Sequence, residues 1–251
     1  NDGVLNLLNA TKGVNVVAPT WFTVSGNHGE ITSLASDAYV SRARSLGVDV
    51  WGVCNDFSND SKIGKVLERT TTRQKLEKNL IAEAIKYSLD GINIDFEQVP
   101  ESAGNDYVQF LRELSISCRK NQIVLSVDNY VPTGYTAHYD RKEQGTVVDY
   151  VVIMGYDEHY AGSAEAGSVA SIGYVQQGIE NTVSVVPQEK VINAVPFYTR
   201  LWKWGESLTS EALSMSAAAN YLAQYGVAAS WDETTCQDYA TFEADGVTYQ
   251  I

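Results

Sequence analysis

The octapeptide Asp90-Gly91-Ile92-Asn93-Ile94-Asp95-Phe96-Glu97 is the segment that decides the fold class of this 251-residue chain. Successive side chains of a strand point to opposite faces, so Asn93, Asp95 and Glu97 share one face. Apolar residues occupy the other face, which is typical of a parallel strand covered by helices. Two carboxylates and an amide inside a core are costly unless they are paired or used in chemistry. The segment therefore predicts a buried strand with a functional site at its carboxyl end, where Glu97 stands.

Strand and helix patterns alternate on both sides of this segment. Short apolar runs predict strands at 14–18, 48–53, 91–96, 123–127, 150–154 and 191–195. Helical periodicity predicts intervening helices: one between Ser36 and Gly47, one with a capping box of Thr71 and Gln74, and others around 107–118 and 172–179. This α/β alternation predicts parallel strands, and its wide spacing favours a TIM-type (β/α)8 barrel over a doubly wound sheet.

The end of the chain has a different pattern. A helix is predicted over 210–225, followed by short strands around 228–231, 239–242 and 247–251, with a hairpin signal at Asp245-Gly246. We therefore expect a β/α barrel over residues 1–203 and a small α+β insertion over 204–251. Residues 4–8 make a poor further strand, because only five residues separate them from Val14. A parallel crossover needs about ten or more, so the predicted barrel is two strands short of eight.

Composition excludes several classes of function. The chain has 18 Lys and Arg against 31 Asp and Glu, and its net charge of −13 argues against a nucleic-acid partner. No apolar run is long enough for a membrane span. Three dispersed cysteines and three histidines match no disulfide framework and no zinc spacing, and no Gly-Lys-Ser phosphate loop is present. We therefore expect no cofactor and no metal.

Two other interpretations of the acidic segment compete with a catalytic one. The carboxylates could form a solvated strand face, although the strand has the pattern of one buried on both sides. Asp90, Asp95 and Glu97 could instead hold a divalent metal, since carboxylate oxygens suit magnesium or calcium. The metal interpretation is less favoured because no further acids cluster at matching strand ends.

The octapeptide resembles the signature Asp-Gly-x-Asp-x-Asp-x-Glu of family 18 glycoside hydrolases, with Asn93 in place of an aspartate. Its Asn-Ile-Asp-Phe-Glu form is similar to the form found in the branch of spore-cortex and peptidoglycan-lytic enzymes from Gram-positive, spore-forming bacteria. Further segments resemble this branch, namely residues 18–22, 51–57, 125–132, 152–159 and 196–200. In this family an α+β insertion lies between the seventh and eighth strands. The resemblance thus implies that strands two to seven are present, that the first and last are lacking in this chain, and that open barrel edges allow self-association.

The resemblance also implies a glycosidase with a substrate-assisted retaining mechanism. Glu97 would protonate the glycosidic oxygen and later activate water, while the 2-acetamido oxygen of the substrate acts as the nucleophile. Asp95, about 7 Å along the same strand face, would orient the acetamido N–H, stabilise the positive intermediate and keep Glu97 protonated. Tyr156 would hydrogen-bond the acetamido oxygen, and Asp157 would contact the sugar or Glu97. We expect Asn93 to donate a hydrogen bond that holds Asp95 ionised.

Further polar and aromatic residues follow the predicted strand ends, where the loops of barrel enzymes gather. The residues expected to bind substrate are Trp21, Phe22, Asn55, Asn129, Tyr130, Glu158, Tyr198, Arg200 and Trp202. For Trp21 and Trp202, packing against the tail is as good an interpretation as stacking on sugar rings. Asp90 is expected to brace the turn into its strand, and His159 to be a neutral hydrogen-bonding residue.

The expected function is hydrolysis of a β-linked glycan that contains N-acetylglucosamine, with peptidoglycan or spore cortex as the favoured substrate. By resemblance the protein would act outside the cell, at the cell wall or spore envelope, with a carbohydrate as its partner. Two alternatives remain open. One is a non-catalytic glycan-binding barrel protein, although such relatives usually lose the terminal acid that Glu97 retains here. The other is a metal-dependent barrel enzyme of different chemistry.

Overall fold

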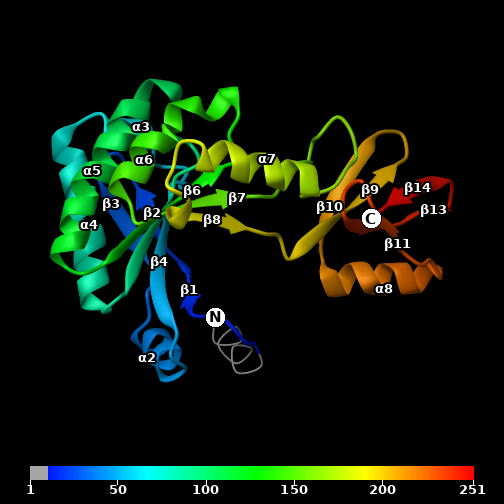
Figure 1. The fold of residues 1–251 in the computed structure, drawn as a ribbon, viewed down its shortest axis with the longest axis horizontal. Coiled ribbons are helices and arrows are strands. Elements are labelled where there is room, and N and C mark those ends of the chain that lie inside the picture. The colour runs from blue at the N-terminus through cyan, green and yellow to red at the C-terminus, as the bar shows by residue number, and fades with distance from the viewer. Residues whose placement is uncertain (1–10) are drawn as a thin grey trace. The chain divides into compact units, whose positions relative to one another are not determined.

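The computed structural model describes residues 11–251, which form two compact units (Figure 1). Unit 1 comprises the described residues up to Val152 together with Val183–Ile192, and unit 2 comprises Ile153–Thr182 and Asn193–Ile251. The doubtful strand at 4–8 lies outside the described residues. No helix between residues 11 and 251 combines the length and the apolar character needed to cross a membrane.

A largely parallel sheet forms the centre of unit 1 (Figure 1). Its order is β3-β2-β4-β5-β6-β7-β8, and β1 pairs with β4. The pairs β2–β4, β4–β5 and β5–β6 are parallel, which confirms the expected α/β class, and the strands described do not close into a ring. The strands are β1 (Val16–Val17), β2 (Thr20–Ser25), β3 (Glu30–Ser33), β4 (Asp49–Asn55), β5 (Gly91–Asp95), β6 (Val124–Tyr130), β7 (Tyr150–Met154) and β8 (Val191–Ala194).

Helices occupy the connections of this sheet. They are α2 (Asp37–Ser45), α3 (Ile63–Leu67), α4 (Thr70–Lys86), α5 (Gly104–Lys120) and α6 (Arg141–Val147), with the 3-10 turns η1 (Glu101–Ala103), η2 (Gly134–Tyr139) and η3 (Gln188–Lys190). The N-cap predicted for α2 is confirmed, because the Ser36 hydroxyl accepts a hydrogen bond from the Tyr39 N–H at 3.3 Å. The chain leaves this helix through Gly47, whose φ of +72° suits a residue without a Cβ.

The predicted capping box of α4 is wrong. The N-cap of α4 is Arg69, which makes no side-chain cap, and Thr71 and Gln74 lie inside the helix. The helix begins earlier because α3 runs almost directly into it. The Thr72 hydroxyl donates to the carbonyls of Val66 and Arg69 at 2.5 and 2.9 Å, which fixes this junction.

The apolar face of β5 packs into the core of unit 1. Ile92 and Ile94 are fully buried, and Phe96, just past the strand, is 1% exposed. The Phe96 ring lies 5.8 Å from Phe110 and 6.0 Å from Tyr107, both on α5. Burial of one such side chain contributes about 1.5–3 kcal/mol, so this packing fixes which face of β5 carries the polar residues.

Unit 2 is built around an antiparallel sheet of order β10-β9-β14-β13. Its elements are α7 (Ile172–Val183), β9 (Tyr198–Trp204), β10 (Leu208–Ser214), α8 (Met215–Tyr225), β11 (Ser230–Asp232), β12 (Gln237–Tyr239), β13 (Thr241–Ala244) and β14 (Val247–Gln250). The antiparallel tail is confirmed. Asp245 and Gly246 have φ values of +53° and +76°, as a two-residue hairpin turn requires.

One helix of the tail is shorter than predicted. Residues 208–214 form β10, which pairs with β9 along its whole length, and the helix begins only at Met215. Ser214 caps it by accepting a hydrogen bond from the Ala217 N–H at 3.2 Å. The antiparallel sheet already starts at Tyr198, and an insertion with its boundary at residue 204 stays a prediction.

Candidate functional site

The polar face of β5 leads to the carboxyl edge of the sheet. Asn93 is 4% exposed, while Asp95 and Glu97 are half-buried, as a strand entering a cleft requires. In the sheet register Asp95 stands beside Asn55 of β4, and Asn93 stands beside Ser126 of β6. The polar face predicted from alternation is therefore continued by polar side chains of both neighbouring strands.

Asn93 does not bond Asp95 as expected. Its amide donates to the Ser126 hydroxyl and to the Asp128 carboxylate, both at 2.9 Å. These two bonds use both amide protons, so neither is left for Asp95. The expectation that Asn93 holds Asp95 by donating a hydrogen bond is wrong, because the neighbouring strand β6 supplies the acceptors.

Asp128 is a site residue that the sequence reasoning missed. It lies two residues beyond Ser126, so strand alternation places both on the face that Asn93 shares. Burial raises the pKa of Asp128 to about 6, against the opposing effect of the hydrogen bond from Asn93. The same alternation applied to residues 124–130 would have selected Asp128.

Asn129, which was predicted to bind substrate, belongs to the other face of β6. Its side chain is 1% exposed, and its amide donates to Gln144 of α6 at 2.6 Å. Gln144 in turn donates to the Tyr139 carbonyl at 2.7 Å. Asn129 therefore ties β6 to the segment that follows it, and it is not a substrate ligand.

Asp56 holds the backbone that carries Glu97. This carboxylate, 2% exposed, accepts hydrogen bonds from the N–H groups of Glu97 at 3.1 Å and Gln98 at 2.8 Å. Burial raises the pKa of Asp56, and the two backbone N–H groups oppose that rise. Asp56 was not selected from the sequence, although it follows β4 directly, at the same sheet edge as Glu97.

Tyrosine hydroxyls support the same loop. Tyr130 donates to the Glu97 carbonyl at 3.3 Å, and Tyr139 donates to the Phe96 carbonyl at 2.9 Å. Arg141 donates to the Tyr130 carbonyl at 2.8 Å. Of the predicted binding residues in unit 1, Tyr130 is thus brought directly to Glu97, in a position that fixes the loop.

Asp95 is the electrostatic centre of this cluster. Burial raises its pKa to about 7, and the charges of Asp128, Glu97 and Asp56 add to the rise in that order. Its Oδ1 atom is buried and has no hydrogen-bond partner among residues 11–251. Burial and the neighbouring carboxylates thus favour the protonated form of Asp95, which runs against the expectation that it is held ionised.

The aromatic residues of β2 are core residues. Trp21 is 2% exposed and packs edge-on against Tyr39 of α2 at 5.2 Å, and Phe22 is fully buried. Neither offers a ring face to a sugar. Asn55 is 6% exposed, and its side-chain oxygen Oδ1 accepts a hydrogen bond from the Phe57 N–H at 3.3 Å.

The metal interpretation of the acidic segment fails on geometry. Asp90 precedes β5, where its carboxylate accepts from the Val50 N–H at 2.9 Å and pairs with Arg44 at 3.1 Å. This confirms its bracing role and leaves it about 20 Å along the strand from Glu97. No group of three or more His, Cys, Asp or Glu within the described part of the chain is placed to hold a metal ion.

A second polar cluster lies in unit 2, after β7. The Tyr198 hydroxyl donates to the Asp157 carboxylate at 2.5 Å, and the ring of Tyr156 lies edge-on to that of Tyr198 at 6.3 Å. Asp157 has a φ of +58°, in the left-handed region that few residues other than glycine adopt. Such strain persists only where the surroundings hold it, and it often marks a functional position. Three predicted site residues are thus brought together.

The remaining predicted residues of unit 2 make structural contacts. The Glu158 carboxylate accepts from the N–H and hydroxyl of Ser171 at 2.7 and 3.0 Å and so anchors the start of α7. Trp202 is 2% exposed and donates to the Gly167 carbonyl at 3.0 Å, so it is not a sugar platform. Arg200 donates to the Ser210 hydroxyl at 3.1 Å. His159 bonds the Ser168 carbonyl at 2.8 Å, as expected of a hydrogen-bonding residue.

Known proteins resemble this chain in sequence and in fold. A family model described as "Glycosyl hydrolases family 18" matches residues 39–250. The chain is similar to the "Uncharacterized glycosylase YvbX" of Bacillus subtilis (strain 168), with 28% identity over 78% of this chain and 60% of the relative. It is also similar to the "Cortical fragment-lytic enzyme" of Bacillus anthracis, with 26% identity over 74% of this chain and 45% of that protein. The chain therefore spans about half the length of these relatives.

Among solved structures, the spore cortex-lytic enzyme SleL of Bacillus megaterium QM B1551 superposes with a TM-score of 0.87 at 21% identity. The match covers 99% of this chain and 59% of that one. At this level of identity the likeness shows the fold, which is of the TIM-barrel type.

Proposed function

Because the chain belongs to glycosyl hydrolases family 18, we propose that it hydrolyses a β-linked glycan containing N-acetylglucosamine, with Glu97 as the acid/base. Peptidoglycan or spore cortex is the proposed substrate class, and the cortex-lytic names of two similar proteins support that choice. Action outside the cell, at the wall or spore envelope, belongs to the same proposal.

The observation that carries the proposal is the unsatisfied Asp95. Buried polar atoms in native proteins nearly always have a hydrogen-bond partner, and an exception calls for an explanation. The Oδ1 atom of Asp95 is such an exception among the described residues, and Glu97 follows two residues later, just past the end of β5. The acetamido N–H of a bound amino sugar is a donor of the type that this oxygen requires.

The proposed reaction has two steps. Glu97 first donates its proton to the glycosidic oxygen while the acetamido oxygen of the substrate attacks the anomeric carbon. The C–O bond breaks, the leaving sugar departs with the bonding electrons, and a cyclic oxazolinium ion remains. The Glu97 carboxylate then takes a proton from a water molecule, which attacks the anomeric carbon and reopens the ring with retained configuration.

Asp95 stabilises the positive intermediate in this scheme. A positive charge next to a carboxyl group lowers its pKa and favours the anionic form. Because the pKa of Asp95 is raised, the oxazolinium charge would shift this carboxyl toward its ionised form. Interactions that strengthen in this way toward the transition state are the ones that accelerate a reaction.

The test uses paired chromogenic substrates, one with a 2-acetamido group and one with a 2-hydroxyl group, together with NMR of the first product formed. Hydrolysis that needs the acetamido group and releases the β-anomer is expected. Release of the α-anomer, or equal rates for both substrates, contradicts the acetamido mechanism. Activity removed by a chelator and restored by magnesium supports the metal-dependent alternative, and binding without turnover supports the glycan-binding alternative.

The roles of Tyr156 and Asp157 stay predictions from the sequence. Tyr156→Phe removes one hydroxyl and is expected to lower kcat more than it raises KM, because the hydroxyl is assigned to the attacking acetamido group. An unchanged kcat contradicts that assignment.

A further inference from the structure

A cavity of about 530 Å³ lies in unit 1 beside the carboxyl end of β5. Residues 61–65 and Glu68, from the β4–α3 connection and from α3 with its C-cap, form one wall, and residues between Gln98 and Asp106 form the other. The cavity is large enough for a short peptide but is not one of the clusters that the proposed reaction uses. We call it the Lys62–Asp106 pocket.

The Lys62–Asp106 pocket is lined by charges of both signs. Lys62, Lys65 and Glu68 belong to one wall, and Asp106 belongs to the other. Lys62 is the N-cap of α3 and has an extended backbone, and Lys65 lies within the helix. Neither forms an ion pair within residues 11–251. Two exposed, unpaired cations side by side are notable in a chain with a net charge of −13.

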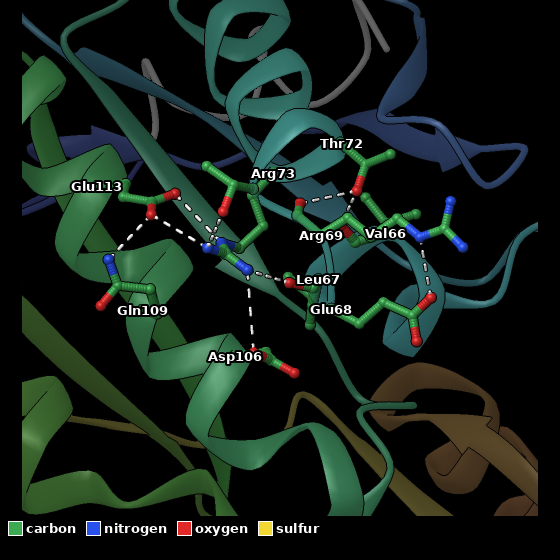
Figure 2. Close-up of polar contacts among 10 residues, drawn as sticks. Val66, Leu67, Glu68, Arg69, Thr72, Arg73, Asp106, Gln109 and Glu113 are labelled. Carbon is green, nitrogen blue, oxygen red and sulfur yellow. Dashed lines mark hydrogen bonds and ion pairs between the residues drawn. The ribbon is translucent and has the colours of Figure 1, made fainter.

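Asp106 is held in place by a buried arginine and still has acceptor capacity for a ligand. Figure 2 shows Arg73 reaching from α4 to α5, with Glu113 on one side and Asp106 on the other. Glu113 accepts from Nε and Nη2 of Arg73 at 3.3 Å each, and the Leu67 carbonyl accepts from Nη1 at 2.6 Å. Asp106 lies farther off, 3.9 Å from Nη1, and its side chain is 37% exposed. Its second oxygen points away from Arg73 (Figure 2).

The pocket is rigid where its two walls meet. A Cβ added to Gly64 of α3 would lie 2.8 Å from the Cγ atom of Pro100, so backbone and proline ring are already in close contact. Ala103, also at this junction, is 4% exposed. A preformed pocket avoids the entropic cost of ordering itself when a ligand binds.

The pocket is adjacent to Glu97. Gln98, which lines it, is the next residue of the chain, and consecutive Cα atoms are about 3.8 Å apart. The Gln98 N–H is fixed by Asp56 at 2.8 Å, so the two positions keep a constant separation. The loop that carries Glu97 therefore also forms part of the pocket wall.

We propose that the Lys62–Asp106 pocket binds a short peptide branch of the glycan that carries both a carboxylate and an amine. The carboxylate would pair with Lys62 and Lys65, the amine with Asp106, and the peptide amides with the Gln98 side chain. A neutral sugar polymer has no charged group that could pair with the two lysines, whereas peptide-substituted wall glycan carries groups of both signs. This inference rests on the proposed function, since it makes the peptide-bearing glycan the preferred substrate.

Peptide binding is tested without any hydrolysis. The probe is the synthetic tetrapeptide Ala-Glu-Lys-Ala with free carboxylates and a free side-chain amine, titrated against the whole chain by amide NMR. Shifts at the amides of Gln98 and Ser102, lost in Lys62→Ala/Lys65→Ala, are expected. The matched control is Lys78→Ala/Lys142→Ala, which removes the same charge from exposed positions outside the pocket and should bind as the parent does.

Hydrolysis gives the second readout. On peptide-bearing fragments the kcat/KM of Lys62→Ala/Lys65→Ala should be about tenfold lower than that of the parent chain. This loss corresponds to about 1.4 kcal/mol and should arise from a higher KM. On the peptide-free oligosaccharide its rate should match that of the parent chain. Absence of peptide-induced shifts at the pocket, or an equal loss on both substrates, overturns the inference. Failure to cleave either substrate counts against the proposed function and leaves the NMR titration to decide the pocket.

Discussion

Replacement of Asp128 by asparagine is the sharpest perturbation of the carboxylate cluster. The oxygen that accepts the hydrogen bond from Asn93 at 2.9 Å is retained as an amide oxygen, so the packing of β5 on β6 is preserved. Only the negative charge is removed. Asp128→Asn therefore isolates the electrostatic influence of Asp128 on Asp95.

The magnitude follows from the order of the causes at Asp95. Burial is the largest contribution to its pKa of about 7, and the charge of Asp128 is the second, ahead of Glu97 and Asp56. The pKa of Asp95 should therefore fall in Asp128→Asn, and by more than in a variant that removes the charge of Glu97 or of Asp56. The direction is downward because a like charge that opposed ionisation has been removed.

The assay is a carboxyl ¹³C NMR titration of aspartate-labelled protein between pH 4 and pH 9, with Asp95→Asn used to assign the signal. Asp37→Asn, which removes one charge from α2, is the matched control and should leave the Asp95 midpoint unchanged. A midpoint for Asp95 that stays the same or rises in Asp128→Asn refutes the electrostatic coupling described for this cluster.

Three further outcomes follow from the same contacts. Asp56→Asn keeps one acceptor oxygen for the two backbone N–H groups at Glu97 and Gln98. The lost hydrogen bond to a charged group is worth about 1.5–3 kcal/mol, so kcat should fall about 10–100-fold. A parent-like kcat with an intact circular dichroism spectrum contradicts the positioning role. The free energy of unfolding, measured by urea titrations, should fall as pH rises from about 4 to about 7, because native Asp95 keeps a proton that an unfolded carboxyl has lost. Asp95→Asn should make this pH dependence less steep. An equally steep dependence in that variant argues against its assignment to Asp95. Arg73→Met should destabilise unit 1 by about 3–5 kcal/mol, since it removes the cation paired with Glu113 and leaves that carboxylate with the hydrogen bond from Gln109. A smaller loss in Arg73→Met/Glu113→Gln supports that cause, and an equal or larger one opposes it.

The periodicity of apolar residues predicted most of the fold. Five of the six predicted parallel-type strands correspond to β4, β5, β6, β7 and β8, because apolar spacing and turn residues are local properties of the chain, and the helix capped by Ser36 was predicted for the same reason. The first predicted strand, 14–18, overlaps only the two-residue β1, and β2 and β3 were not predicted. The errors occurred where a tertiary partner decided the outcome. Residues 208–214 have helix-compatible composition, yet β9 offers a full-length pairing partner, and that pairing is invisible in a local pattern.

The candidate site was predicted unevenly for the same reason. Asn93, Asp95 and Glu97 followed from alternation on one strand, which needs no knowledge of neighbours. Asp56 and Asp128 become site residues only through their contacts with β5 and with the loop after it. Aromatic residues near strand ends were over-selected, because Trp21 and Trp202 have the same composition signal whether they stack on sugar or fill a core.

The most direct test of the central claim is the hydrolysis rate of Glu97→Gln on cortex fragments that contain N-acetylglucosamine. Glu101→Gln, four residues further on in the exposed turn η1, is the matched control. Loss of the acid/base group should reduce kcat by about 10²–10⁴-fold with an unchanged melting temperature, while the control keeps the parent rate. A Glu97→Gln variant as active as the parent chain would show that the chemistry does not take place at the end of β5.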